Sequence, residues 1–181
     1  MCQLCGEGTF AAHAIALSER PQEILCGLRW IGTYKAAALG ETEQLLRKVQ
    51  AFSDVRKAMW KSPIVALSRT VDDATFEYFA GISVEPAEAM PAGFELQHIP
   101  EMTVASSWHG HEDGDVLAHY GQILDWLRAN GLRRDRTNCD HREEYPHDVN
   151  LDAPPALRLM LPVESVSDQM PKGGGFTASA V

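Results

Sequence analysis

The chain has no long hydrophobic run. Its longest apolar stretch, residues 10–17, is short and is interrupted by His13, and no basic segment precedes an apolar core at the N-terminus. A membrane-spanning helix needs about 20 consecutive apolar residues, and a secretory leader needs a basic start followed by an apolar segment. The sequence therefore argues against both, and it favours a cytoplasmic protein with reduced thiols.

Basic residues are scarce relative to acidic ones. Lys and Arg number 16 against 25 Asp and Glu, the formal net charge is −9, and no run of basic residues occurs. Nucleic-acid-binding surfaces need clustered positive charge to neutralise phosphates, so direct contact with DNA or RNA is not expected. Cationic partners are favoured, although such a charge also serves solubility alone. Only about twenty residues precede the first predicted strand, too few for a helix-turn-helix.

The four cysteines do not form the two close pairs of a structural zinc site. Cys2 and Cys5 have the spacing of a zinc-binding pair, but Cys26 and Cys139 supply no comparable second pair. A structural zinc ion takes four ligands, usually from two such pairs. The sequence therefore predicts free thiols, no metal and no cofactor.

An internal repeat is present. A shift of 78 positions superposes Trp30-x-Gly32 on Trp108-x-Gly110, Leu45-Leu46 on Ile123-Leu124, and Val49 on Leu127. A Trp-x-Gly pair in register with helical apolar spacing indicates duplication better than either feature alone. Because 181 residues suffice for one domain, we expect repeat one over about 21–85 and repeat two over about 94–163 within a single domain 21–163.

Each copy is predicted to contain a strand, a helix and two further strands. The strands are expected at 24–30, 64–69 and 75–84, and at 102–109, 141–145 and 157–163. The helices are expected over about 41–57 and from a cap at Asp113 or Asp115 to Gly131. The second helix has apolar residues at helical spacing, which are expected to pack in the core: Val116, Tyr120, Ile123, Leu124 and Leu127. One copy cannot complete a core alone, whereas two copies side by side can.

The predicted fold class is α+β. A tandem duplication of the strand-helix-strand-strand unit forms one antiparallel sheet, with two helices on one face and a ligand groove on the other, at the pseudo-twofold axis. Residues 1–20 form an N-terminal extension without an assigned role, and Pro86, Pro91 and Gly93 mark the linker between the copies. Residues 164–181 lack apolar periodicity and are predicted to be disordered.

Five short motifs occur in an order used by few families. They are Ile99-Pro, Ala105-Ser-Ser-Trp-His-Gly110, Trp126-Leu-Arg-Ala-Asn-Gly131-Leu, Arg142-Glu-Glu-Tyr145-Pro and Leu157-Arg-Leu-Met-Leu-Pro162-Val. In this order the chain resembles the GyrI-like small-molecule-binding family, the effector-binding fold found behind the DNA-binding parts of AraC-type and MerR-type regulators. The resemblance implies a ligand-binding pocket in a stand-alone member without a DNA-binding domain.

Glu143 is the first candidate for the pocket. Side chains alternate along a strand, so Glu143 and Tyr145 share one face, and Arg142 and Glu144 share the other. In the family an acidic residue two positions before a tyrosine on this strand lies at the base of the pocket, and Glu143 matches it. A carboxylate in an apolar cavity either binds a cation or takes up a proton. Without the resemblance, two solvated acids at a strand end would be the simpler interpretation.

The other ligand-binding candidates are aromatic residues and two residues of the last strand. Trp30, Tyr34, Phe79 and Trp108 could form aromatic walls that stack on a flat cation, although each alone could equally belong to a core. Family members often carry an acid just before the closing Pro-Val, where this chain has Arg158. If Arg158 and Met160 face the groove, Arg158 could neutralise Glu143 and admit a neutral or anionic ligand.

Histidines supply the last candidate. His109 matches a position where the family often has histidine, and it joins the ligand-binding candidates. His98, His111 and His119 lie near it in sequence, but no pair has the one-face helical spacing of a zinc site with a carboxylate. We therefore predict that these three lie on the surface and in loops.

The sequence favours binding or sensing of a flat, apolar, cationic small molecule. The first alternative is a hydrolase of reactive natural products, as in some relatives, with Glu143 as the catalytic general base. The second is a gyrase-inhibitor-like protein-interaction module, although the acidic residues are scattered rather than massed in one run. The expected partner is the small molecule, with no nucleic acid and no membrane, and a protein partner is not identified.

Overall fold

The computed structural model describes residues 14–56, 60–85 and 90–164. The Cys2–Cys5 pair, the predicted end of the first helix at Lys57 and the predicted tail beyond Glu164 lie outside the described residues. Glu164 itself donates its backbone N–H to the carbonyl oxygen of Arg133 at 3.0 Å.

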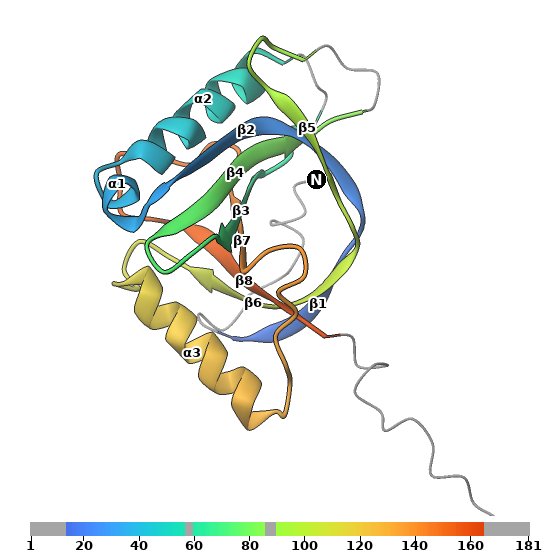
Figure 1. The fold of residues 1–181 in the computed structure, drawn as a ribbon, viewed down its shortest axis with the longest axis vertical. Coiled ribbons are helices and arrows are strands. Elements are labelled where there is room, and N and C mark those ends of the chain that lie inside the picture. The colour runs from blue at the N-terminus through green and yellow to red at the C-terminus, as the bar shows by residue number, and fades with distance from the viewer. Residues whose placement is uncertain (1–13, 57–59, 86–89, 165–181) are drawn as a thin grey trace, which may run out of the picture.

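In the described part of the chain, eight strands form one antiparallel sheet, which Figure 1 shows to be strongly curved. The order across the sheet is β1-β6-β8-β7-β3-β4-β2-β5, so β7 and β3 lie at its centre. The strands are β1 (Ala16–Arg20), β2 (Glu23–Thr33), β3 (Ile64–Thr70), β4 (Thr75–Ser83), β5 (Glu95–Ile99), β6 (Met102–His109), β7 (His141–Tyr145) and β8 (Leu157–Val163). The α+β class is confirmed, and the six predicted strands are all present.

Among the described residues, three helices accompany the sheet: α1 (Tyr34–Ala38), α2 (Glu41–Val55) and α3 (Val116–Ala129). Asp115 rather than Asp113 caps α3, because its side chain accepts from the Leu117 N–H at 3.1 Å. Gly131 follows α3 with a φ of 67°, as its predicted place requires. The short helix α1 was not predicted; Thr33 caps it by accepting from the Ala36 N–H.

The duplication accounts for the strand order. The units β2-α2-β3-β4 and β6-α3-β7-β8 occupy the two halves of the sheet, and β3 pairs with β7 between them. Two strands absent from the prediction, β1 and β5, extend the sheet symmetrically. Each precedes one unit and pairs with the first strand of the other, β1 with β6 and β5 with β2. The residues before the first predicted strand therefore include an edge strand of the sheet.

The central strands of the two copies superpose with a shift of 77 rather than 78 residues. β3 begins at Ile64 and β7 at His141, and Ala66 pairs with Glu143 at the pseudo-twofold axis. Because side chains alternate with period two, a change of one residue moves the matched side chain to the other face. On the outer strands, Trp30 packs on the face under α2, whereas Trp108 pairs with Arg158 and shares the opposite face with it.

Both faces of the sheet carry a core. The helix face, which we define as the face covered by α2 and α3, has one apolar cluster under each helix (Figure 1). The opposite face has its own cluster: Leu25, Val65, Leu67, Phe79, Ile99, Met102, Val104, Cys139 and Met160. The curvature of the sheet brings side chains of distant strands together on that concave side. Apolar side chains thus fill much of the face on which the groove was predicted.

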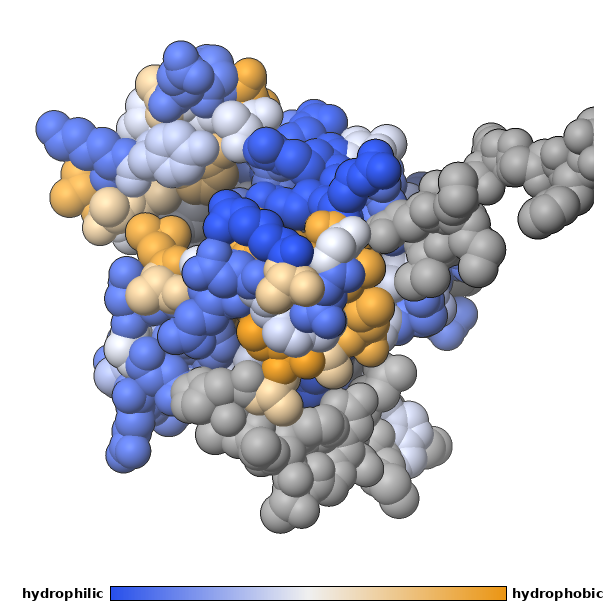
Figure 2. Space-filling model, turned by 90° about the horizontal axis from the view of Figure 1, so that it is seen from below, coloured by the Kyte–Doolittle hydropathy of each residue, from blue (hydrophilic) through white to orange (hydrophobic). Residues whose placement is uncertain are grey.

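No helix among the described residues is long and apolar enough to span a membrane. On the face shown in Figure 2, hydrophilic side chains form much of the surface, with hydrophobic ones between them. Cys26 and Cys139 are both buried, and neither forms a disulfide with another described residue.

Candidate ligand-binding site

A cavity of about 520 Å³ lies on the helix face, between the N-terminal ends of α2 and α3. Its floor comes from β3, β4 and β7, and its rim comes from α1, the first turns of α2 and α3, and the loop after β7. The lining includes Tyr34, Glu43, Leu46, Ser68, Phe76, Tyr78, Val116, Tyr120, His141, Glu143, Tyr145 and Leu151. The groove was predicted on the face without helices, so its face was wrong, while its position at the pseudo-twofold axis agrees with the structure.

Glu143 lies at the floor of the cavity, where β7 crosses the pseudo-twofold axis. It is half-buried, and each carboxylate oxygen accepts one phenol: Oε1 from Tyr120 Oη at 3.2 Å and Oε2 from Tyr145 Oη at 2.8 Å. The hydroxyl of Tyr78 is in turn hydrogen-bonded to that of Tyr145. Within the described part of the chain, no lysine or arginine lies at ion-pair distance from Glu143. The carboxylate is therefore held by neutral donors alone.

Burial controls the protonation of these groups. Removal from water raises the pKa of Glu143 above its ordinary value, although the hydrogen bonds from Tyr145 and Tyr120 partly offset this. Burial, together with the charge of Glu143, raises the pKa values of Tyr78, Tyr120 and Tyr145 well above that of a free phenol. All three phenols are neutral at physiological pH. Each can therefore act only as a hydrogen-bond donor toward Glu143, and the phenols can also form hydrogen bonds with one another.

His141 adds a neutral polar group beside the carboxylate. Burial, followed by the charge of Arg134, lowers its pKa to about 4, so the imidazole is uncharged at pH 7. Its ring meets Tyr120 edge to face with centroids 4.7 Å apart, and its Nδ1 lies 3.2 Å from Ser68 Oγ. His141 thus adds no positive charge that could compensate Glu143.

An aromatic cluster forms one wall of the cavity. Phe76 stacks on Tyr34 with centroids 4.8 Å apart and meets Tyr78 edge to face at 6.4 Å. Trp30 meets Phe76 edge to face, with ring centroids 5.3 Å apart, and donates its indole N–H to Glu41 at 2.8 Å. Tyr34 is half exposed, with 51% of its surface accessible, so this wall reaches from the floor to solvent. The cavity offers flat apolar surfaces next to an acidic group.

The structure gathers some of the predicted site residues and separates others. Glu143, Tyr145 and Tyr34 line the cavity, and Trp30 stands behind its aromatic wall. His109 lies near His119, outside the cavity lining. Phe79, Trp108, Arg158 and Met160 lie on the opposite face and do not contribute to this cavity. The separation follows from strand alternation, because neighbouring positions on β4 and β8 face opposite sides.

The opposite face holds a charged cluster of its own. Arg142 is 3% exposed and donates to Glu144 at 2.8 Å and to Glu23 at 2.7 Å, while Arg20 donates to Glu144 at 3.0 Å. Arg158 lines a cavity of about 330 Å³ with these residues. The sheet therefore separates Arg158 from Glu143, and the predicted neutralisation of Glu143 by Arg158 is wrong.

The cavity residues that were missed as site residues include Phe76, Tyr78, Tyr120 and His141. Phe76 and Tyr78 share a face of β4 with Ala80 and Ile82, an apolar alternation that could have placed them under the helices. Tyr120 was assigned to the helix core, which it also serves, since it is 7% exposed. His141 shares its strand face with Glu143 and Tyr145, so period two alone would have found it.

Residues 13–164 match the sequence profile of the GyrI-like small molecule binding domain. The chain belongs to this family. Comparison with curated proteins by sequence finds no match.

Solved structures share the fold. SAV2435 bound to tetraphenylphosphonium is 12% identical with a TM-score of 0.64, over 87% of this chain and 98% of that one. The EcmrR C-terminal domain is 17% identical with a TM-score of 0.56, over 85% and 99%. A hydrolase from Listeria innocua is 10% identical with a TM-score of 0.51, over 84% and 93%. At such identities, the likeness to this GyrI-like domain concerns the fold.

Proposed function

We propose that this GyrI-like domain binds an aromatic organic cation in the cavity between α2 and α3, with the positive charge directed at Glu143. The observation that carries the proposal is the half-buried carboxylate of Glu143, held by Tyr120 and Tyr145 without a cationic partner among the described residues. A charge removed from water without a counter-ion is costly to the folded protein. A cationic ligand would supply the missing counter-ion.

The surrounding charges do not oppose a cation. His141 is neutral at pH 7, and Arg69, which lines the cavity, pairs with Glu77. Two arginines outside the lining also pair with acids: Arg47 with Glu43 and Asp152, and Arg136 with Asp140. Arg134 is half-buried and donates to the main-chain carbonyl of Asp140. The net charge of −9 also favours the approach of a cation.

The aromatic lining suits a ligand with several rings. The faces of Phe76, Tyr78 and Tyr34 offer both apolar contact and the negative ring face that attracts cations. The volume of about 520 Å³ falls in the range of small-molecule sites. SAV2435, which shares the fold, is a protein bound to tetraphenylphosphonium. That compound is therefore a suitable first probe for this chain.

Two ions of matched shape and opposite charge separate electrostatic from apolar binding. Tetraphenylphosphonium is expected to raise the melting temperature, because a ligand that binds only the folded state stabilises it by about 2.7 kcal/mol at 100 times its Kd. Tetraphenylborate, with the same four rings and a negative charge, is expected to produce no comparable shift. Differential scanning fluorimetry with both ions, followed by calorimetry, makes the comparison. Equal shifts, or a larger shift with the borate, would overturn the assignment of a cationic ligand.

A hydrolase is the second candidate, and the raised pKa of Glu143 favours it. A carboxylate of raised pKa is a stronger base, and its position in the cavity would let it activate a water molecule. If so, an aryl epoxide such as styrene oxide is expected to be opened to its diol faster than in buffer. Glu143→Gln is then expected to lower the rate by roughly 10²–10⁴-fold. Chromatographic diol measurement decides: formation at the buffer rate argues against a hydrolase, and full activity of the variant removes Glu143 from the mechanism.

A further inference from the structure

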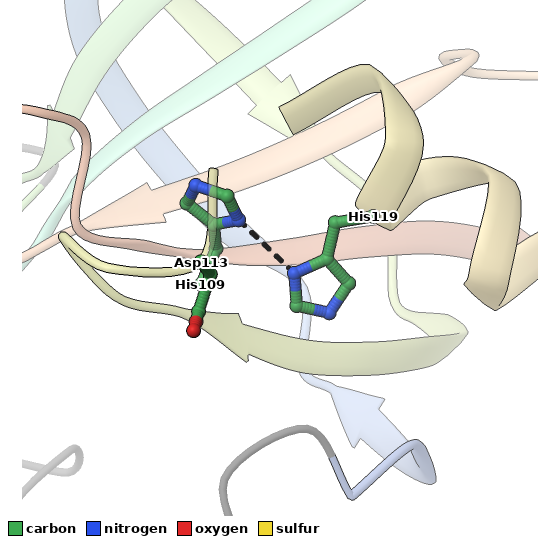
Figure 3. Close-up of side chains that lie close together, drawn as sticks. All are labelled: His109, Asp113 and His119. Carbon is green, nitrogen blue, oxygen red and sulfur yellow. Dashed lines mark hydrogen bonds between the residues drawn. The ribbon is translucent and has the colours of Figure 1, made fainter. Parts of the chain in front are cut away.

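A cluster of two histidines and one aspartate lies apart from the ligand cavity. His109 ends β6, Asp113 lies in the turn that follows, and His119 lies at the end of the first turn of α3. One nitrogen of each imidazole and one carboxylate oxygen all lie within 4.8 Å of one another. Figure 3 shows the two tilted rings with one nitrogen of each pointing toward the other. Histidines predicted to be surface and loop residues thus include a buried one, since His119 is 2% exposed.

The two imidazoles meet through their Nδ1 atoms, which are 3.0 Å apart (Figure 3). His109 is 1% exposed, and its Nε2 is buried without a hydrogen-bond partner among the described residues. A bare Nδ1 on both rings would point two lone pairs at the same point. That is the donor arrangement of a metal site.

The neighbouring contacts orient the donors. His119 Nε2 lies 3.0 Å from Ser107 Oγ, and an N–H donated there leaves Nδ1 bare. Asp113 Oδ2 accepts from the Gly110 N–H at 2.6 Å, which fixes the carboxylate in the turn. Two nitrogen ligands of a tetrahedral zinc ion, with bonds of about 2.0–2.1 Å, lie roughly 3.3 Å apart. The observed Nδ1 separation needs only a small expansion to admit the ion.

We propose that His109, Asp113 and His119 form a zinc site. Two imidazoles and one carboxylate provide three of the four ligands that zinc takes, which leaves one position for another donor. Asp113 is half-buried, so the cluster has a way in for the ion on that side. The ion would tie β6 to α3, whose first turns line the ligand cavity through Val116 and Tyr120. The site does not depend on the proposed ligand or on the role of Glu143.

The test is zinc binding by the full chain. Metal-free protein is dialysed against limiting ZnCl₂, and bound metal is measured by mass spectrometry, with the melting temperature recorded with and without zinc. We expect one zinc per chain and a higher melting temperature. His119→Gln and Asp113→Asn preserve polar contacts but remove ligands, and each is expected to weaken binding by at least about 100-fold, beyond the 10–100-fold typical of outer-shell changes. His98→Gln, at an exposed histidine, is the matched control and should bind as the wild type does.

A second pair of variants locates the metal. Cys2→Ser/Cys5→Ser removes the close cysteine pair of the sequence, which has the spacing of a zinc-binding pair. The visible spectrum of bound Co²⁺ reports the ligand set and does not require an identified activity. Retained binding in the cysteine variant with loss in His119→Gln supports the site. Zinc lost with the cysteines but kept in both His119→Gln and Asp113→Asn, or no bound zinc in the wild type, overturns it.

Discussion

Glutamine in place of Glu143 is expected to weaken tetraphenylphosphonium binding by about 30-fold or more, since losing one member of a buried charge pair costs about 2–5 kcal/mol. The same change is expected to stabilise the unliganded protein by about 0.5–2 kcal/mol, in the manner of other strained functional sites. Glutamine keeps the size of the side chain and can still accept from one phenol. Binding and stability should therefore move in opposite directions.

The pH dependence follows from the sign of the pKa shift. Burial raises the pKa of folded Glu143 above the value of the unfolded chain, so folding takes up a proton between these two values. Ionised Glu143 does not destabilise the folded protein below the unfolded pKa. The destabilisation grows as the pH rises from the unfolded to the folded pKa and is complete above the folded pKa. Cation binding has the reverse dependence and is lost as the pH falls and the carboxylate is protonated. The contribution of Glu143 to both dependences should disappear in Glu143→Gln.

Glu43→Gln is the matched control for these measurements. Glu43 lines the rim of the same cavity, but it is exposed and paired with Arg47 at 2.6 Å. Its neutral variant should bind tetraphenylphosphonium nearly as well as the wild type and melt at nearly the same temperature. Chemical denaturation and calorimetry over a pH series provide the data. Equal losses of affinity in the two variants would mean that general acidity, rather than the charge at the floor, attracts the cation.

Methionine in place of Arg142 is expected to cost about 3–5 kcal/mol of unfolding free energy, because it leaves the buried carboxylate of Glu144 with one partner fewer. Arg142 and Glu144 are 3% and 6% exposed. They connect β7 to both sides of the β1–β2 turn, because Glu144 accepts from Arg20 and Arg142 donates to Glu23. The double variant Arg142→Met/Glu144→Met removes both charges. It is expected to recover part of the loss, with a coupling of about 0.5–3 kcal/mol.

Urea denaturation measures all four corners of this double-mutant cycle. Arg69→Met provides the exposed control, since Arg69 pairs with Glu77 at 3.3 Å with about half of its side chain accessible. Its loss should cost less than about 1 kcal/mol. If Arg142→Met lowers the free energy of unfolding no more than Arg69→Met does, the charged cluster on the opposite face does not stabilise the fold as expected.

Local patterns were sufficient for much of the fold. The apolar stripe Val116, Tyr120, Ile123 and Leu127 defined α3, with Asp115 as one of two predicted caps. Period two placed Glu143 and Tyr145 on a common face, which the structure confirms through their hydrogen bond. These signals succeed because helical and strand periods are properties of a single segment.

The repeat was informative about architecture but misleading about faces. The shift of 78 aligned Trp30 with Trp108, yet the central strands superpose with a shift of 77, and the two indoles lie on opposite faces. A strand pattern cannot reveal its own register, because a slip of one residue exchanges both faces without changing composition. The edge strands β1 and β5 were missed for a related reason: each pairs with the other copy, so its partners lie far away in sequence.

The sequence alone determined the family, the α+β duplication and the pairing of an acid with a tyrosine on one strand, because these depend on local order and spacing. Tertiary structure alone decided on which face Glu143 meets Tyr120 and which aromatic residues line the cavity with Glu143. It also decided that Arg158 lies on the opposite face of the sheet. Those outcomes depend on strand register and on where the helices cross the sheet. Both are set by packing between segments far apart in the chain, and single-sequence periodicity contains no information about that packing.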